Sequence, residues 1–176
     1  MRKKSPTGVF IALLVGGCAA SGSAVTHHSR SGAELLAAAE HSFSDIPFGV
    51  REPPPSLTLI YDGGCVAGRG ECSYIDANHV MHYFDDGELV VKSIELGKVG
   101  TRPIAALGIG KARALDEVVA QVRRFLPEAE VSCDKNGKLK NALHECGATL
   151  GDGWVKLFFD TSGRLDEVRV DAYQFT

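Results

Sequence analysis

The sequence lacks any long hydrophobic run. Its most apolar segment near the N-terminus, residues 9–15, has seven residues. As a helix, that segment reaches only about 10 Å, whereas the hydrocarbon core of a bilayer is about 30 Å thick. Neither this run nor any other segment is therefore expected to cross a membrane as a helix.

Sequence motifs of common enzyme classes are also lacking. There is no GxSxG nucleophile elbow. Gly108 and Gly110 are followed by residues 111–113 (KAR), so the third glycine of a dinucleotide-binding fingerprint is missing, and a P-loop would need glycine where Ala105 stands. We interpret Gly108 and Gly110 as turn residues and predict no catalytic residue. A Ser/His/Asp triad leaves no local motif, so a hydrolase remains an alternative.

Metal-binding patterns are equally scarce. The cysteines lack CxxC spacing, and the acidic turn at residues 134–137 lacks the final glutamate of an EF-hand loop. His79 and His82 are three residues apart, and in a strand they would point to opposite faces. The sequence therefore predicts neither a metal site nor a cofactor.

An excess of positive charge is missing too. The formal net charge is −3, and residues 31–100 carry four Lys or Arg against eleven Asp or Glu. Proteins that follow the phosphates of nucleic acids are basic. We therefore expect no nucleic-acid partner.

The N-terminus, by contrast, carries a recognisable signal. Arg2, Lys3 and Lys4 precede the apolar run. The last residue of the run, Val15, begins the segment 15–18 (VGGC). This segment resembles the lipobox of bacterial lipoprotein signal peptides, which implies removal of residues 1–17 and lipid attachment to Cys18. More than one acyl chain gives stable anchoring. The alternative is an ordinary secretory signal that is cut near Ala24 and loses Cys18.

The lipobox resemblance also implies a location. Alanine rather than aspartate follows Cys18, which in lipoprotein signals indicates sorting to the outer membrane, facing the periplasm. Residues 18–30 are small and polar and are expected to form a flexible tether between the lipid and the folded part. The membrane, through the lipid on Cys18, is therefore one expected partner.

Four cysteines remain beyond the signal. An even number in an oxidising compartment predicts disulfides, and three pairings are possible for Cys65, Cys72, Cys133 and Cys146. The local pairs Cys65–Cys72 and Cys133–Cys146 are the favoured ones. The alternative of a zinc site would need all four thiolates to stay reduced.

Hydrophobic periodicity and turn residues predict alternating elements. A capping box at Ser31 and Glu34 starts a helix that should end near Phe43, and a second helix is expected over residues 115–126. Turns at residues 85–87 and 160–163 indicate two hairpins. The expected strands cover residues 56–61, 71–75, 80–84, 88–96, 130–133, 144–150, 154–159 and 164–173.

The two halves of the chain repeat each other in outline. Glu71-Cys72 in the first half matches Glu145-Cys146 in the second. The turn after Phe84 likewise matches the turn after Phe159. Such self-similarity suggests one unit used twice. We therefore predict an α+β fold of two tandem helix-plus-antiparallel-sheet units, residues 31–100 and 101–176, with a curved sheet and one local disulfide per unit.

This tandem layout resembles the secreted β-lactamase inhibitor protein family, and the second unit resembles the small lipoproteins of the barrel-assembly machinery. The resemblance rests on residues 48–50 (FGV), 108–110 (GIG), 154–159 and the closing hairpin. It departs from the family at Lys111 and Ala112, where a Ser/Thr helix cap is missing, and at the three prolines 53–55. It implies an α+β fold with a curved antiparallel sheet that binds proteins, but no contact residue transfers.

Strand alternation predicts which side chains share a face of the sheet. Val80, Phe84, Val155, Leu157 and Phe159 share one face, which we assign to the helices. The other face is rich in residues that favour interface cores: His79, Met81, Tyr83, Trp154, Lys156 and Phe158. We predict that it docks an envelope protein partner. The alternatives are that a loop or the proline-rich segment covers this face, and that the chain is a hydrolase or a structural lipoprotein without a dedicated ligand.

Overall fold

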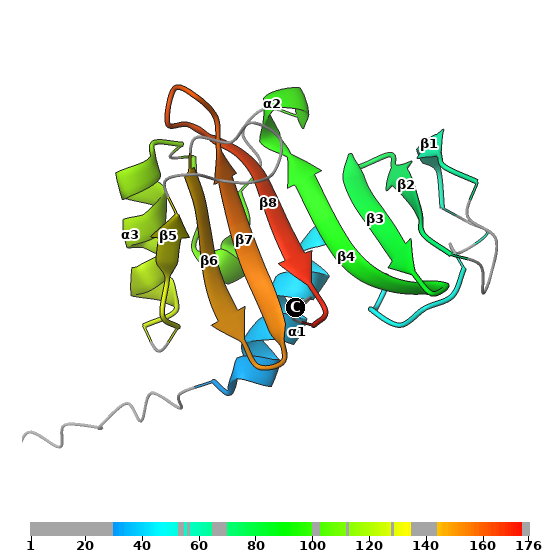
Figure 1. Cartoon of the computed structure of the whole chain (residues 1–176), viewed down its shortest axis with the longest axis horizontal. Helices are drawn as coiled ribbons and strands as arrows, with labels where there is room; N and C mark the ends of the chain where they lie inside the picture. Colours follow the sequence, from blue (N-terminus) through cyan, green and yellow to red (C-terminus); the bar gives the residue numbers. More distant parts are fainter. Residues whose placement is uncertain are drawn as a thin grey trace, which may run out of the picture.

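The computed structural model describes residues 30–52, 55, 57–64, 70–99, 103–111, 113–127, 129–134 and 144–173. The described residues form one antiparallel sheet of eight strands in the order β1-β2-β3-β4-β8-β7-β6-β5. Figure 1 shows β4 as a long, curved strand near the middle of this sheet. The strands are β1 (Leu59–Asp62), β2 (Cys72–Asp76), β3 (Val80–Asp85), β4 (Glu88–Glu95), β5 (Ser132–Asp134), β6 (His144–Leu150), β7 (Gly153–Phe159) and β8 (Leu165–Asp171).

Both predicted helices are present. α1 (Gly32–Phe43) begins with the predicted capping box, in which Ser31 accepts from the Glu34 amide and the Glu34 carboxylate accepts from the Ser31 amide. α3 (Leu115–Phe125) has two acidic residues in its first turn and two arginines in its last, which suits the helix dipole. The described residues also form the short helix α2 (Leu96–Val99) and the 3-10 turn η1 (Ala105–Leu107).

Both predicted hairpins are confirmed as well. β3 and β4 are joined at Asp86 and Gly87, which adopt positive φ angles of 48° and 74°. β7 and β8 are joined through residues 160–163, where the Asp160 carboxylate accepts from the amides of Ser162 and Arg164. Asp and Gly tolerate these backbone conformations better than most residues, which explains why the turns were visible in the sequence.

The prediction of two tandem helix-plus-sheet units is wrong. β4 pairs with β8 over residues 91–95 and 167–171, so the strands of both halves form a single sheet. α1 belongs to the first half, yet it contacts β6 and β8 of the second half as well as β4. Figure 1 shows α1 crossing behind the joined sheet. The chain segments 31–100 and 101–176 are therefore not separately packed units.

Packing explains this difference. The main hydrophobic core draws on both halves, since Phe43 and Ile94 pack with Leu157 and Val168. Among the described residues, a smaller cluster under the first-half strands contains four buried residues, Ile46, Tyr74, Phe84 and Leu89, and no helix residue belongs to it. The buried α1 residues Ala39 and Phe43 lie instead in the core that both halves share.

α1 approaches the second half at backbone distance. A Cβ atom on Gly32 would lie 2.4 Å from the Gly151 amide nitrogen, in the turn between β6 and β7. Gly151 has a φ of 61°, a conformation that favours glycine. Glycine on both sides of this contact lets the start of the helix rest directly on the turn.

The structure shows the disulfide Cys133–Cys146, which joins directly opposed residues of β5 and β6. Cys72 is disulfide-bonded too, but Cys65, its predicted partner, lies outside the described residues, so the pair Cys65–Cys72 stays a prediction. The lipobox and Cys18 also lie outside the described residues. Within the described part of the chain, no helix combines the length and apolarity needed to cross a membrane.

Candidate functional site

The face of the sheet opposite α1 and α3 is the candidate site, and we call it the distal face. Strand register defines it. One line of opposed residues runs Met81, Ser93, Arg169 and Lys156, and the next runs Tyr83, Val91, Asp171 and Trp154. The residues that alternate with these lines point to the helices and are buried: Val80, His82, Val155, Leu157, Val168 and Val170.

The predicted core face is therefore confirmed, and the predicted contact residues divide into two groups. Met81, Tyr83, Trp154 and Lys156 lie together on the distal face and are partly exposed. Phe158 shares this face but is buried.

His79 is placed differently from the prediction. It lies in the turn before β3 with a φ of 60°, so it is exposed but outside the strand. The alternation rule failed there because residues 77–79 form a turn rather than an extended segment.

Asp171 holds the middle of the distal face together. Its carboxylate, which is buried, accepts from Arg169 Nε and lies 3.2 Å from Lys156 Nζ. Lys156 Nζ also sits 5.2 Å from the centroid of the Trp154 ring, within the range of a cation–π contact. The three flanking side chains are thus held in place by one another and by a carboxylate that solvent does not reach.

Tyr83 flanks this network on the first-half side. Desolvation, followed by a hydrogen bond with Glu71 and the charge of that carboxylate, raises the pKa of Tyr83 to about 12. Tyr83 therefore presents a neutral phenol at any physiological pH. Beyond it, Met81 lies opposite Ile75, and Ile75 lies opposite Tyr61, whose side chain is 53% exposed.

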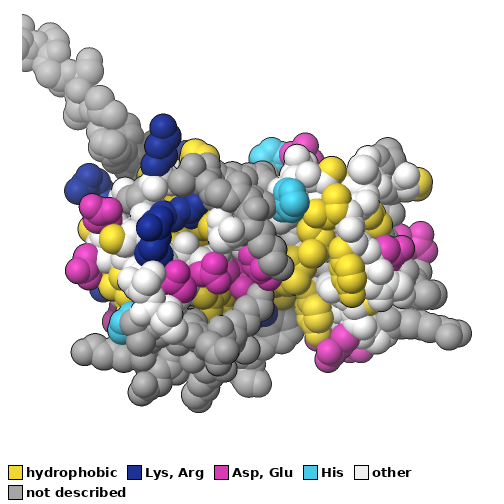
Figure 2. Space-filling model, turned by 90° about the horizontal axis from the view of Figure 1, so that it is seen from above, with side chains coloured by type: hydrophobic (Ala, Val, Ile, Leu, Met, Phe, Trp, Pro, Cys, Tyr) yellow, Lys and Arg dark blue, Asp and Glu magenta, His cyan; other side chains and the backbone are white. Residues whose placement is uncertain are grey.

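Hydrophobic and basic side chains gather at different ends of the molecule. Figure 2, a view from above, shows hydrophobic side chains over the end that contains β1–β3 and Lys and Arg towards the other end, whereas Asp and Glu occur at both ends.

Sequence reasoning missed Arg169 and Asp171. Alternation within residues 164–173 would have placed both on one face of a strand. Which face, and which neighbours, depends on the pairing of β8 with both β4 and β7. The hairpin turn revealed only the second of these pairings.

A second polar group lies on the core face of the first half. Tyr74 and His82 are cross-strand neighbours whose rings stack at 4.6 Å, and His82 Nε2 lies 3.2 Å from Asp76 Oδ2. Burial alone would raise the pKa of Asp76, but hydrogen bonds from His82 and from the Val80 and Asn78 amides outweigh it and hold that pKa below 3.8. All three side chains are buried, so this group is part of the core.

Lys92 extends that group towards α1. It is fully buried and opposes His82 across the strands. Its ammonium lies 3.2 Å from the Ser44 carbonyl and 3.4 Å from Glu40 Oε1, at the negative end of the α1 dipole. Desolvation lowers the pKa of Lys92, opposed by the charge of Glu40.

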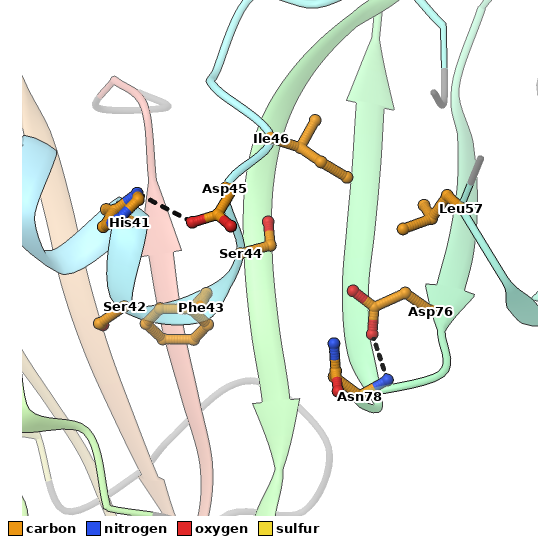
Figure 3. Close-up of a pocket in the computed structure, with 9 residues that line it drawn as sticks. All are labelled: His41, Ser42, Phe43, Ser44, Asp45, Ile46, Leu57, Asp76 and Asn78. Atoms are coloured by element: carbon orange, nitrogen blue, oxygen red, sulfur yellow. Dashed lines mark hydrogen bonds and ion pairs between the residues drawn. The ribbon is translucent and has the colours of Figure 1, made fainter. Parts of the chain in front are cut away.

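A pocket of about 320 Å³ opens between the end of α1 and the β2–β3 turn. Figure 3 shows Asp76 and Asn78 on one side of it and Ser44 and Asp45 on the other, with the Asp45 carboxylate turned towards His41. The carboxylate oxygens of Asp76 are already bonded to His82 and to backbone amides. Two other polar side chains that line the pocket are also engaged: His41 Nδ1 lies 3.3 Å from Asp45 Oδ1, and the Ser42 hydroxyl donates to the Ala39 carbonyl at 2.7 Å.

The described residues include no group of three or more His, Cys, Asp or Glu arranged to hold a metal ion. Comparison with known proteins finds no family model, no curated protein and no solved structure that matches this chain. The resemblance to the β-lactamase inhibitor protein family therefore stays a prediction.

Proposed function

We propose that this chain is a lipid-anchored envelope protein that docks another protein on the distal face of its sheet. The observation that carries the proposal is the network of Trp154, Lys156, Arg169 and Asp171. Trp, Tyr and Arg are the residues most enriched among interface hot spots, which also favour ordered, well-packed surroundings. Here they are partly exposed and already ordered before any partner arrives.

The exposure of side chains on the two faces also supports docking on the distal face. Core-face positions of β3, β7 and β8 are buried, whereas Met81, Tyr83, Trp154, Lys156 and Arg169 on the distal face keep part of their surface accessible. Large side chains that are ordered and half-buried lose little conformational entropy on binding.

The proposal is tested by photocrosslinking in the native cells. A photoreactive phenylalanine analogue replaces Tyr83 or Thr149 on the distal face, and Glu117 or Ala120 on the exposed side of α3 as matched controls. We expect one discrete crosslinked species from both distal-face positions and none from α3. Equal crosslinking from α3, or no species from either distal-face position, would contradict docking on this face.

The variants Trp154→Ala and Leu157→Ala separate binding from folding. Trp154→Ala should leave the thermal midpoint nearly unchanged and reduce partner capture roughly thirtyfold, because a central aromatic typically contributes about 2 kcal/mol or more. Leu157 is buried in the core, so Leu157→Ala should lower the free energy of unfolding by about 2–5 kcal/mol. Unfolding of the Trp154→Ala protein would place Trp154 in the core instead.

The lipid anchor is tested separately. Cys18→Ala should abolish incorporation of labelled palmitate and leave uncleaved precursor, because no thiol remains for the diacylglycerol. Ser21→Ala, three residues further along the tether, is the matched control and should be labelled normally. Labelling that persists in the Cys18→Ala protein would overturn the lipoprotein proposal without affecting the docking proposal.

A further inference from the structure

The inference concerns the chemistry of the partner and rests on the docking function proposed above. Two cations contact the single carboxylate of Asp171: Arg169 through Nε, and Lys156 through Nζ at 3.2 Å. The centre of the distal face thus holds more hydrogen-bond donors and more positive charge than its own acceptor uses.

Two neutral donors add to this excess. The Ser93 hydroxyl and the Trp154 indole N–H are buried and have no hydrogen-bond partner among the described residues. Register puts Ser93 directly opposite Arg169, and Trp154 directly opposite Asp171, so both lie within the same group of side chains. A buried donor without an acceptor costs free energy, which a ligand that brings an acceptor recovers.

The two cations are accessible. The side chains of Lys156 and Arg169 are 16% and 23% exposed, whereas Asp171 is only 1% exposed. An incoming group therefore meets the cations first. A positively charged group would be repelled at this point, and an apolar group would leave the donors unsatisfied.

We propose that a carboxylate side chain of the partner, an aspartate or glutamate, docks between Lys156 and Arg169 beside Trp154. Arginine and lysine bind carboxylates through charge-assisted hydrogen bonds, which are stronger than neutral ones. Asp171 holds both cations in position, so binding requires little further ordering.

Negative neighbours restrict the choice to an isolated carboxylate. Glu167 precedes Arg169 by two residues in β8, so it lies on the same face about 7 Å away. It opposes Glu95 on β4. On the next strands, Phe158 and Glu145 continue this line. A run of acidic residues or a polyphosphate would meet these carboxylates, whereas a single aspartate or glutamate would not.

Trp154 is the only tryptophan in the chain, so its indole N–H gives one resolved signal in a ¹H–¹⁵N spectrum of the purified full chain. The probe is the capped peptide acetyl-Gly-Asp-Gly-amide, and the same peptide with Asn is the control. We expect a saturable shift of the indole signal with the Asp peptide and at least tenfold weaker binding of the Asn peptide. Equal binding of both peptides, or no shift up to about 50 mM peptide, would overturn the proposal.

Variants assign the effect to the two cations. Lys156→Gln should weaken Asp-peptide binding at least tenfold, and Lys156→Arg should restore it. The control is Lys111→Gln, at an exposed position before α3 and outside the sheet, which should leave binding unchanged. Partner crosslinking at Tyr83 separates the two proposals. Undiminished crosslinking in the Lys156→Gln protein would refute the carboxylate while docking stands, and absent crosslinking in the wild type would refute docking itself.

Discussion

Tyr74 shows how single residues on the core face balance packing against polarity. Its ring stacks on His82 and packs against Phe84 at 5.6 Å, while its hydroxyl is buried without a hydrogen-bond partner among the described residues. Desolvation, with a smaller effect of the Asp76 charge, raises the pKa of this phenol well above its usual value. The side chain therefore contributes through its ring, and its hydroxyl opposes folding.

Tyr74→Phe should accordingly raise the free energy of unfolding by about 1–2 kcal/mol, because it removes an unsatisfied buried group. The exposed Tyr61→Phe is the matched control and should change little. Both free energies are measured by urea denaturation at pH 7. A Tyr74→Phe protein less stable than the wild type would show that the hydroxyl has a partner in solution.

The same residue predicts a pH dependence. Burial keeps the Tyr74 phenol neutral in the folded state, whereas the unfolded chain ionises it above a pKa of about 10, so a rise in pH above that value favours unfolding. The wild type should therefore lose stability above about pH 10. Tyr74→Phe should reduce this loss without abolishing it, since the pKa of Tyr83 is also raised, to about 12. Chemical denaturation at pH 8 and pH 11 measures the difference.

At the scale of elements, the start of α1 depends on two facing glycines. Gly32→Ala would improve helix propensity, but the new Cβ would lie 2.4 Å from the Gly151 nitrogen, and backbone on both sides leaves little room to move. We expect a net loss of about 1–3 kcal/mol in the free energy of unfolding. Gly110→Ala, where nothing lies within 4 Å of the new Cβ, should be neutral or slightly stabilising.

The disulfide between β5 and β6 supports the edge of the sheet. β5 has three residues, and among the described strands it pairs with β6 alone. Replacing the cystine by Cys133→Ser and Cys146→Ala should lower the free energy of unfolding by about 3 kcal/mol. Non-reducing peptide mapping should show Cys133–Cys146 and, as the sequence predicts, Cys65–Cys72. Recovery of free thiols at Cys133 and Cys146 in exported protein would contradict the structure.

At the scale of the whole molecule, the β4–β8 pairing and the position of α1 make the described residues one cooperative body. Residues 101–176 expressed alone would lack α1 and leave part of their main core exposed. We expect no cooperative thermal transition from this fragment or from residues 31–100, and a single transition from the full chain. A fragment that unfolds cooperatively would show that the halves are independent.

Local structure followed from interactions between residues that are close in the sequence. Ser31 and Glu34 defined the start of α1, Asp86-Gly87 and Asp160–Gly163 defined two hairpins, and alternation identified Leu157 and Val155 as core residues. Each of these rests on interactions between residues close in the chain: a cap bond, a turn conformation, or the two-residue period of a strand. The distal location of Met81, Tyr83, Trp154 and Lys156 followed from the same period.

The way in which these elements combine depends on contacts between residues that are far apart in the sequence. The matching halves suggested two separate units because local patterns repeat in each, but pairing between β4 and β8 depends on residues about 75 positions apart that carry no local signal. In the joined sheet, α1 contacts β6 and β8 of the second half, and Ser93 lies opposite Arg169. The donor-rich centre of the distal face exists because side chains from β4, β7 and β8 meet there, and neighbours across strands are set by the lowest free energy of the whole sheet rather than by any one segment.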